Sequence, residues 1–211
     1  MRINQLNSSP QFSSRNATIR FADNIARKIN TVYPRISSTK YEGLGYQEFF
    51  TPNLKDLFLS IECMRMRISD RISRSSLKFV DCAKIRTQEI LKSKVGNCHE
   101  SAMLGELGAK INGLPNCYIA ELKSGSENNV SRMDHAVLYV DSVRNPYIID
   151  PWLGFADYVP NTIERYKKEF SNFFDDKSLE NKMFFEILQP KNKLSKDELS
   201  ELKKEFPQLI I

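Results

Sequence analysis

Three residues of this sequence, Cys98, His135 and Asp150, have side chains that could work together in nucleophilic catalysis. Cys98 follows Gly96-Asn97 and opens an expected helix, whose partial positive charge favours the thiolate over the thiol. A thiolate is the form of cysteine that attacks a carbonyl carbon. His135 could act first as a base and then as an acid, and Asp150 could hold the imidazole in one tautomer.

The helix that begins at Cys98 is expected to pack on a small sheet. Its apolar pattern stops at Asn112-Gly113, a common left-handed cap at the end of a helix. Strand patterns follow over residues 117–122 and 135–140. The polar residues 123–133 between them are interpreted as a loop.

The strands that carry His135 and Asp150 are expected to form a hairpin. Residues 135–140 alternate between two faces, and residues 147–149 form the next strand, which ends at Asp150-Pro151. A tight turn would place the ends of these strands side by side. A helix packed on the face of His135 could then bring Cys98 within hydrogen-bond reach. Taken singly, a cysteine at a helix start or a histidine on a strand is usually structural, so it is their joint placement that indicates catalysis.

The chain before this block is expected to be helical. One helix follows Thr18 and ends before Pro34, a second starts at Thr51-Pro52, and a third covers residues 76–93. The outer faces of the second helix carry four arginines, which we interpret as solvated side chains, with an anion-binding surface as the alternative: Arg65, Arg67, Arg71 and Arg74.

These patterns predict an α+β protein. Residues 1–17 are expected to be a flexible leader, residues 18–93 a helical region and residues 94–211 a catalytic α+β core, with residues 18–211 forming one compact domain. Phe184 to Leu188 is a further candidate strand. A capping-box pattern, Ser195 with Glu198, predicts a last helix that runs to about Phe206.

The composition is that of an ordinary globular protein, with 41% hydrophobic and 27% charged residues. The net charge of +5 is concentrated before residue 98, but no nucleic-acid recognition motif is present. No membrane span or signal-peptide core is visible. Because the four cysteines are sparse, we expect the protein to work in a reducing compartment. Because only two histidines are present to complete a site, we expect no bound metal, and we also expect no cofactor. We expect a monomer.

Three segments resemble the blocks of the papain-like and transglutaminase-like cysteine enzymes. They are GNCHESA from Gly96, DHAVLYV from Asp134 and IIDPW from Ile148. Their spacing is similar to that in the bacterial toxin and effector branch, which includes the dermonecrotic-toxin deamidase domains. The resemblance covers residues 94–155, and its blocks specify a fold and a triad better than a substrate.

The resemblance implies a papain-like core in which Cys98 is the nucleophile, His135 the general base and Asp150 the orienting group. The implied chemistry is a thioester intermediate in the deamidation of glutamine or the cleavage of a protein. Papain-type enzymes have a glutamine a few residues before the cysteine, but the nearest one here is Gln88.

The backbone N–H of Cys98 is therefore the expected oxyanion-hole donor, with an unknown second donor. Asn97 and Trp152 could line the cleft. His99 follows the nucleophile on the helix and should point about 100° away, so we expect it at the surface.

The chain ends add a weaker resemblance to bacterial effectors. The serine-rich start has no acidic residue before Asp23, as in type III secretion leaders, and Glu198, Glu201 and Glu205 precede an apolar end, as in type IV effector tails. A bacterial protein that reaches a host cytoplasm without a signal peptide, and acts there on a host protein, is the resulting expectation. Two alternatives remain: a transferase of the transglutaminase or arylamine acetyltransferase type, and a non-enzymatic helical binding module that uses the basic face of residues 62–74.

Overall fold

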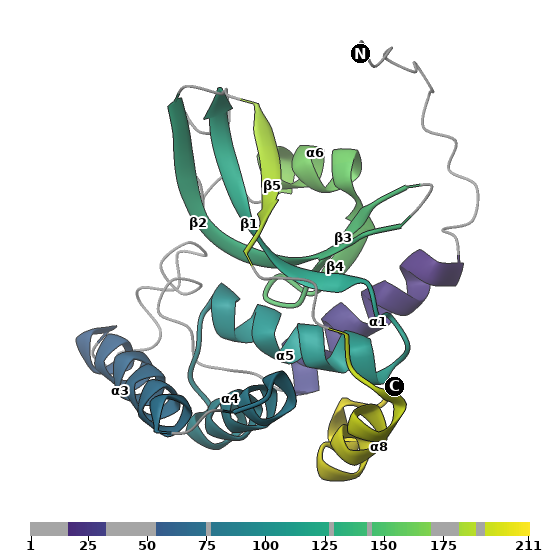
Figure 1. Cartoon of the computed structure of the whole chain (residues 1–211). Coiled ribbons are helices and arrows are strands. Elements are labelled where there is room, and N and C mark those ends of the chain that lie inside the picture. The colour runs from purple at the N-terminus through teal and green to yellow at the C-terminus, as the bar shows by residue number, and fades with distance from the viewer. Residues whose placement is uncertain are drawn as a thin grey trace.

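The computed structural model describes residues 17–32, 54–74, 77–126, 129–142, 145–169, 182–188 and 193–211. Within these residues the protein is α+β, with six α-helices and one antiparallel sheet of five strands (Figure 1). The expected leader, apart from residue 17, and the expected helix start at Thr51-Pro52 lie outside the described residues.

The helices expected in the first half of the chain are present. They are α1 (Ala17–Val32), α3 (Leu54–Ser73) and α4 (Phe79–Ser93). The periodic apolar residues of α1 all lie in the core: Ile19, Ala22, Ile25, Ala26 and Ile29. Phe58 of α3 fits the apolar spacing equally well but is 46% exposed, because spacing alone does not show which helix face meets a neighbour.

Helix α5 (Cys98–Ile111) lies in the middle of the fold (Figure 1). It contacts α1, α4, α8 (Lys196–Glu205) and the sheet, and nearly all of its residues are buried. The predicted stop is confirmed: Gly113 has a φ of 91°, and its backbone N–H donates to the carbonyl of Lys110. Helix α8 opens with the predicted Ser195–Glu198 capping box.

The sheet has the strand order β4-β3-β2-β1-β5. Its strands are β1 (Cys117–Ser126), β2 (Asn129–Val140), β3 (Tyr147–Asp150), β4 (Phe155–Tyr158) and β5 (Met183–Ile187). The predicted hairpin of β2 and β3 is confirmed, with Leu138 opposite Ile149. The fourth candidate strand is β5, shifted by one residue.

The interpretation of residues 123–133 as a loop is wrong. Residues 123–126 extend β1 and residues 129–133 extend β2, so that Lys123 pairs with Arg132 and Gly125 with Val130 after a register shift next to Glu121. Polar residues disfavour strands only weakly, and here the backbone ladder with β2 on one side and β5 on the other satisfies their N–H and C=O groups.

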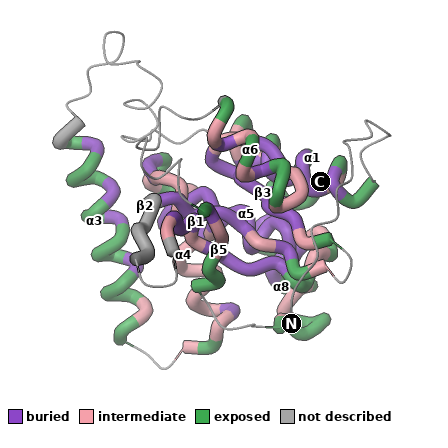
Figure 2. The backbone as a smooth tube through the Cα atoms, turned by 90° about the horizontal axis from the view of Figure 1, so that it is seen from above, coloured by how far each residue is buried: buried purple, intermediate pink, exposed green. Residues whose placement is uncertain are grey.

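Two cores lie on opposite faces of the sheet. The larger one joins the helices α1, α3, α4, α5 and α8 to one face, and the smaller one lies under α6 (Val159–Glu169) on the other face. Figure 2 shows the most continuous burial along α5 and the strands. Strand β4 and helix α6 were not predicted, and together with β3 they form the wall of the site described below.

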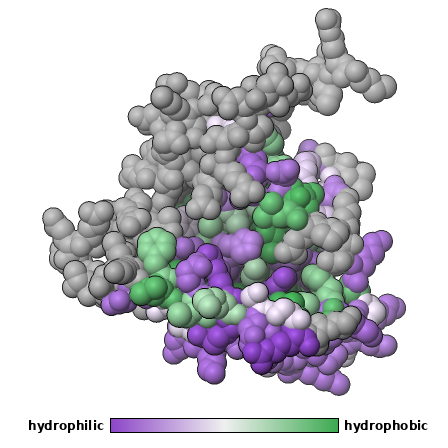
Figure 3. Space-filling view, turned by 60° about the vertical axis from the view of Figure 1, so that its left-hand side comes forward, coloured by the Kyte–Doolittle hydropathy of each residue, from purple (hydrophilic) through white to green (hydrophobic). Residues whose placement is uncertain are grey.

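The surface of the described residues is mixed in polarity. Hydrophobic side chains form separate spots between hydrophilic ones (Figure 3). The large apolar side chains that are exposed lie on α3, at the end of β5 and at the end of the described chain: Phe58, Leu59, Met66, Ile187, Leu188, Ile210 and Ile211. Among the helices in the described part of the chain, none has the length and apolar content needed to cross a membrane.

Candidate active site

The thiol of Cys98 stands on the first residue of α5, directly after Gly96 and Asn97. A capping box closes this turn, because the Glu100 carboxylate accepts the backbone N–H of Asn97 at 2.8 Å. The backbone N–H of Ser101 donates to the Asn97 carbonyl. Cys98 is half-buried. The sulfur is therefore held at the positive end of the helix dipole.

His135 lies on β2, with its imidazole between the thiol and a carboxylate. Its Nε2 is 2.7 Å from Oδ2 of Asp150, and the ring also makes a hydrogen bond with the Cys98 side chain. Because Asp150 occupies Nε2, Nδ1 is the ring nitrogen left to face the sulfur. His135 is 3% exposed and Asp150 is 0% exposed. The structure thus brings the three predicted side chains into one hydrogen-bonded row, with the thiol at the accessible end.

Asp150, the last residue of β3, accepts hydrogen bonds on both carboxylate oxygens. Oδ1 accepts the backbone N–H groups of Trp152 at 3.0 Å and Leu153 at 2.9 Å. The Tyr166 hydroxyl donates to Oδ2 at 2.7 Å. Burial favours the neutral acid, but the charge of His135 and these hydrogen bonds outweigh it and lower the pKa of Asp150. An ionised, oriented carboxylate is the result.

The imidazole of His135 is held in its charged form. Burial alone would lower the pKa of His135, but the charge and the hydrogen bond of Asp150, with a smaller contribution from Cys98, raise it to about 10. The ring is therefore protonated at neutral pH. A buried imidazolium next to a sulfur stabilises the thiolate, the nucleophilic form.

The prediction that α5 packs on the sheet face of His135 is wrong. Ala136 and Leu138 belong to the core beside α5, whereas Val137, on the same side of β2 as His135, belongs to the core under α6. The thiol still meets the imidazole because Cys98 is the first residue of α5, and β1 and β2 curve strongly around that region (Figure 1).

Tyr166 is the site residue that the sequence analysis missed. It is fully buried on α6, and its ring meets that of His135 edge-on with 5.4 Å between the centroids. Helix α6 has recognisable signals, with Pro160 in its first turn and Lys167 and Lys168 in its last. Those signals predict a helix, but nothing in them indicates that its tyrosine hydroxyl reaches Asp150.

The expectation that Trp152 and Asn97 line a cleft stays a prediction. Trp152 is 6% exposed, and its ring lies 5.4 Å from that of His135. Its carbonyl accepts a hydrogen bond from the Asn30 side chain of α1. The Asn97 backbone N–H is engaged by Glu100. The backbone N–H of Cys98 is in the first turn of α5, and its role as an oxyanion donor stays a prediction.

His99 is half-buried rather than a surface residue. Burial is the main cause that lowers its pKa, so the ring is neutral at neutral pH.

The four arginines that were predicted to be solvated are exposed, and each of them also pairs with a carboxylate of this chain. Arg65 binds Glu100, while Arg67 and Arg71 both bind Glu89 of α4. Both carboxylates are buried. The basic face predicted for residues 62–74 is thus largely matched by acidic partners within the protein. Arg74 pairs with Asp70 of its own helix.

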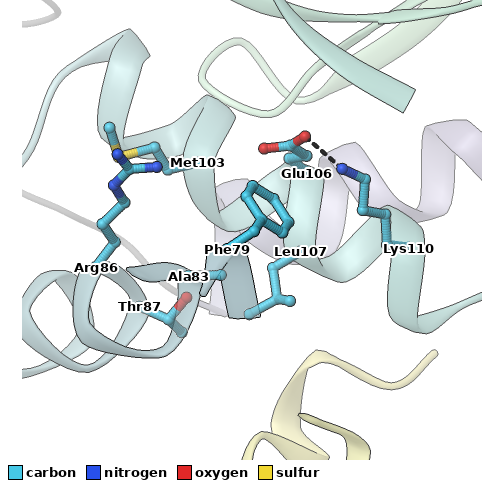
Figure 4. A pocket seen from close by; sticks show the side chains of 8 residues that line it. All are labelled: Phe79, Ala83, Arg86, Thr87, Met103, Glu106, Leu107 and Lys110. Carbon is cyan, nitrogen blue, oxygen red and sulfur yellow. Dashed lines mark hydrogen bonds and ion pairs between the residues drawn. The ribbon is translucent and has the colours of Figure 1, made fainter. Parts of the chain in front are cut away.

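Two hollows lie near α5 without including Cys98 in their lining. An open groove of about 500 Å³ runs between α3 and the segment before α5, with Leu59, Cys63 and Val95 in its wall. A small cavity of about 20 Å³ lies between α4 and α5 and contains the ion pair of Glu106 and Lys110, 2.6 Å apart (Figure 4).

Within the described residues, no three or more His, Cys, Asp or Glu side chains are grouped so that they could hold a metal ion. Comparison of the sequence with protein-family models gives no match, and comparison with curated proteins gives none either.

Proposed function

We propose that this protein is a cysteine-dependent hydrolase of protein amides that works through a thioester on Cys98. The observation that carries the proposal is the buried row in which Asp150 holds His135 and His135 meets the Cys98 thiol. A merely structural cysteine needs no imidazolium beside it. The sequence resemblance to papain-like and transglutaminase-like enzymes supports the same roles for the same three residues.

In the first step, the Cys98 thiolate attacks the amide carbonyl carbon and forms a C–S bond. The C–N bond then breaks, and the leaving nitrogen takes the proton from Nδ1 of His135. Glutamine in this step releases ammonia, and a backbone amide releases a new amino terminus. Asp150 stabilises the imidazolium before the transfer and keeps the ring in place after it.

In the second step, water attacks the thioester while neutral His135 accepts its proton. The C–S bond breaks, the products are a carboxylic acid and the Cys98 thiolate, and His135 is again an imidazolium. An amine in place of water would give the transferase chemistry named above. The row itself is common to all three outcomes, so the outcome depends on which amide enters the site and on which second reactant reaches the thioester.

The binding-module alternative has lost its main support. It required a free basic face on α3, but Arg65, Arg67 and Arg71 each contact a buried carboxylate of this chain. Charge reversal there would disturb the fold before it tested a partner. We therefore keep this alternative only as an outcome of the experiment.

Incubating a eukaryotic cell lysate with the wild type or with Cys98→Ala tests the proposal, because its expected substrate is a host protein. Quantitative peptide mass spectrometry should find glutamines that gain about 1 Da, or new amino termini, only with the wild type. Addition of an amine probe would reveal transfer. Cys63→Ala, which changes the exposed cysteine of α3, is the matched control and should behave as the wild type. Identical peptides from the wild type and Cys98→Ala would overturn the proposal.

A further inference from the structure

We infer that Arg65 of α3 is a positioning residue for the nucleophile, acting through Glu100 on the turn that presents Cys98. This inference rests on the proposed function, because it concerns the reactivity of the same sulfur. It adds a residue far upstream of the three sequence blocks and gives α3 a role in the site.

The contacts link α3 to the first turn of α5. Arg65 Nε donates to Oε1 of Glu100 at 2.8 Å, and its Nη2 donates to Oε2 at 3.2 Å. The same Oε2 accepts the backbone N–H of Asn97, the residue before Cys98. The Glu100 carboxylate thus accepts two hydrogen bonds from the Arg65 guanidinium and one from the backbone of the turn before Cys98.

Burial makes this carboxylate dependent on its partner. The Glu100 side chain is 2% exposed, and burial acts to raise its pKa, but the hydrogen bond from Arg65 is the strongest of the contacts that together lower it. Without the guanidinium, a buried negative charge would stand two residues from the Cys98 sulfur. Such a charge opposes formation of the thiolate, and a protonated Glu100 would leave the Asn97 N–H with a weaker acceptor.

The same helix contains a matched control. Arg67 and Arg71 hold Glu89, which is also buried, at 3.1 Å and 2.8 Å. Glu89 belongs to α4 and to no turn of the site. Arg71→Gln therefore removes an ion pair between α3 and a buried carboxylate of α4 without touching the turn before α5.

The test follows alkylation of Cys98 by iodoacetamide from pH 5 to pH 9, with each cysteine peptide quantified separately by mass spectrometry. In the wild type, Cys98 should react faster at pH 6 than the exposed Cys63 does. Arg65→Gln should slow the reaction of Cys98 at pH 6 by about tenfold, because the unpaired Glu100 carboxylate opposes formation of the thiolate. Arg65→Lys should recover part of the rate, and Arg71→Gln should match the wild type.

A double variant separates positioning from general destabilisation. In Arg65→Gln/Glu100→Gln the unpaired charge is gone while an amide can still accept the Asn97 N–H, so the pH profile should return toward that of the wild type. Circular dichroism shows whether each variant is folded. An unchanged profile in a folded Arg65→Gln, or a double variant as slow as the single one, would overturn the inference. Ordinary reactivity of wild-type Cys98 at pH 6 would instead overturn the proposed function, and this inference with it.

Discussion

The first turn of α5 and the middle of the same helix are held by different forces. The first turn is polar, and its contacts are the Glu100 ion pair and the capping of Asn97. The middle is buried and packs closely. Gly105 leaves no room for a side chain, since an added Cβ would lie 2.5 Å from Cγ of Pro151 and 2.9 Å from Cδ1 of Leu138.

The middle of α5 determines the position of Cys98, whereas the first turn of α5 determines the reactivity of its thiol. Close packing at Gly105 sets the distance between α5 and the end of β3, because Pro151 directly follows Asp150. Charge at the first turn sets the electrostatic field around Cys98. Packing is insensitive to pH and salt, whereas ion pairs respond to both, so the two regions can be perturbed independently.

Charge reversal at the first turn should have the largest effect on stability. Arg65→Glu would place a second carboxylate against buried Glu100, and we expect a loss of about 3 kcal/mol in the free energy of unfolding, at the low end for buried pairs because Arg65 is 42% exposed. Arg71→Glu should cost less, since Arg67 still holds Glu89. Urea denaturation measures both. Equal losses in the two variants would show that the ion pairs of Glu100 and of Glu89 contribute equally to stability.

Filling the middle of the helix should have an intermediate effect. Gly105→Ala forces its new methyl group into the ring of Pro151, and we expect a loss of about 2 kcal/mol in the free energy of unfolding. Displacement of α5 from Asp150 should also slow alkylation of Cys98 at every pH.

Gly108→Ala is the matched control, because its Cβ would meet only Cδ1 of Ile29 at 3.7 Å. Alanine favours a helix over glycine by about 0.5–1 kcal/mol, so this variant should be as stable as the wild type or more so. Thermal unfolding distinguishes the two substitutions. A stable Gly105→Ala would mean that the close approach of α5 to Pro151 is not required.

The parts of the site that were predicted from the sequence have local signals. The turn before Cys98, the strand alternation around His135 and the strand stop at Asp150 are each readable within a few residues. The hairpin of β2 and β3 follows from the short connection between them. These features identify the three residues of the row, whereas the approach of Cys98 to His135 depends on how α5 packs on the sheet.

What was not predicted depends on contacts between distant segments. The Tyr166 hydroxyl reaches Asp150 only because α6 crosses the second face of the sheet. The partner of Arg65 is 35 residues away on another helix, and an exposed-looking arginine gives no sign of it. The sheet face of His135 was misassigned because strand alternation defines two faces but not which helix covers each.

Per pH unit, the change of stability with pH should be the smallest of these effects, and it is the sharpest test of the comparison between the two regions. The raised pKa of His135, about 10, stabilises the fold fully below pH 6.5, and this contribution is lost as the pH rises toward 10. The lowered pKa of Glu100 adds a contribution present above pH 4.5 that is lost as the pH falls further. Each group changes the free energy of unfolding by at most about 1.4 kcal/mol per pH unit.

Urea denaturation between pH 3 and pH 10 should therefore give different curves for variants of the two regions. Arg65→Gln/Glu100→Gln should make the acid side less steep and leave the alkaline side intact, because the Glu100 contribution is removed while that of Asp150 remains. Gly105→Ala should lower the whole curve by the same amount at each pH, because packing involves no proton. If the loss of stability in Gly105→Ala instead grew toward low or high pH, the position of α5 and the charges of the site would be coupled, and the two regions would not act independently.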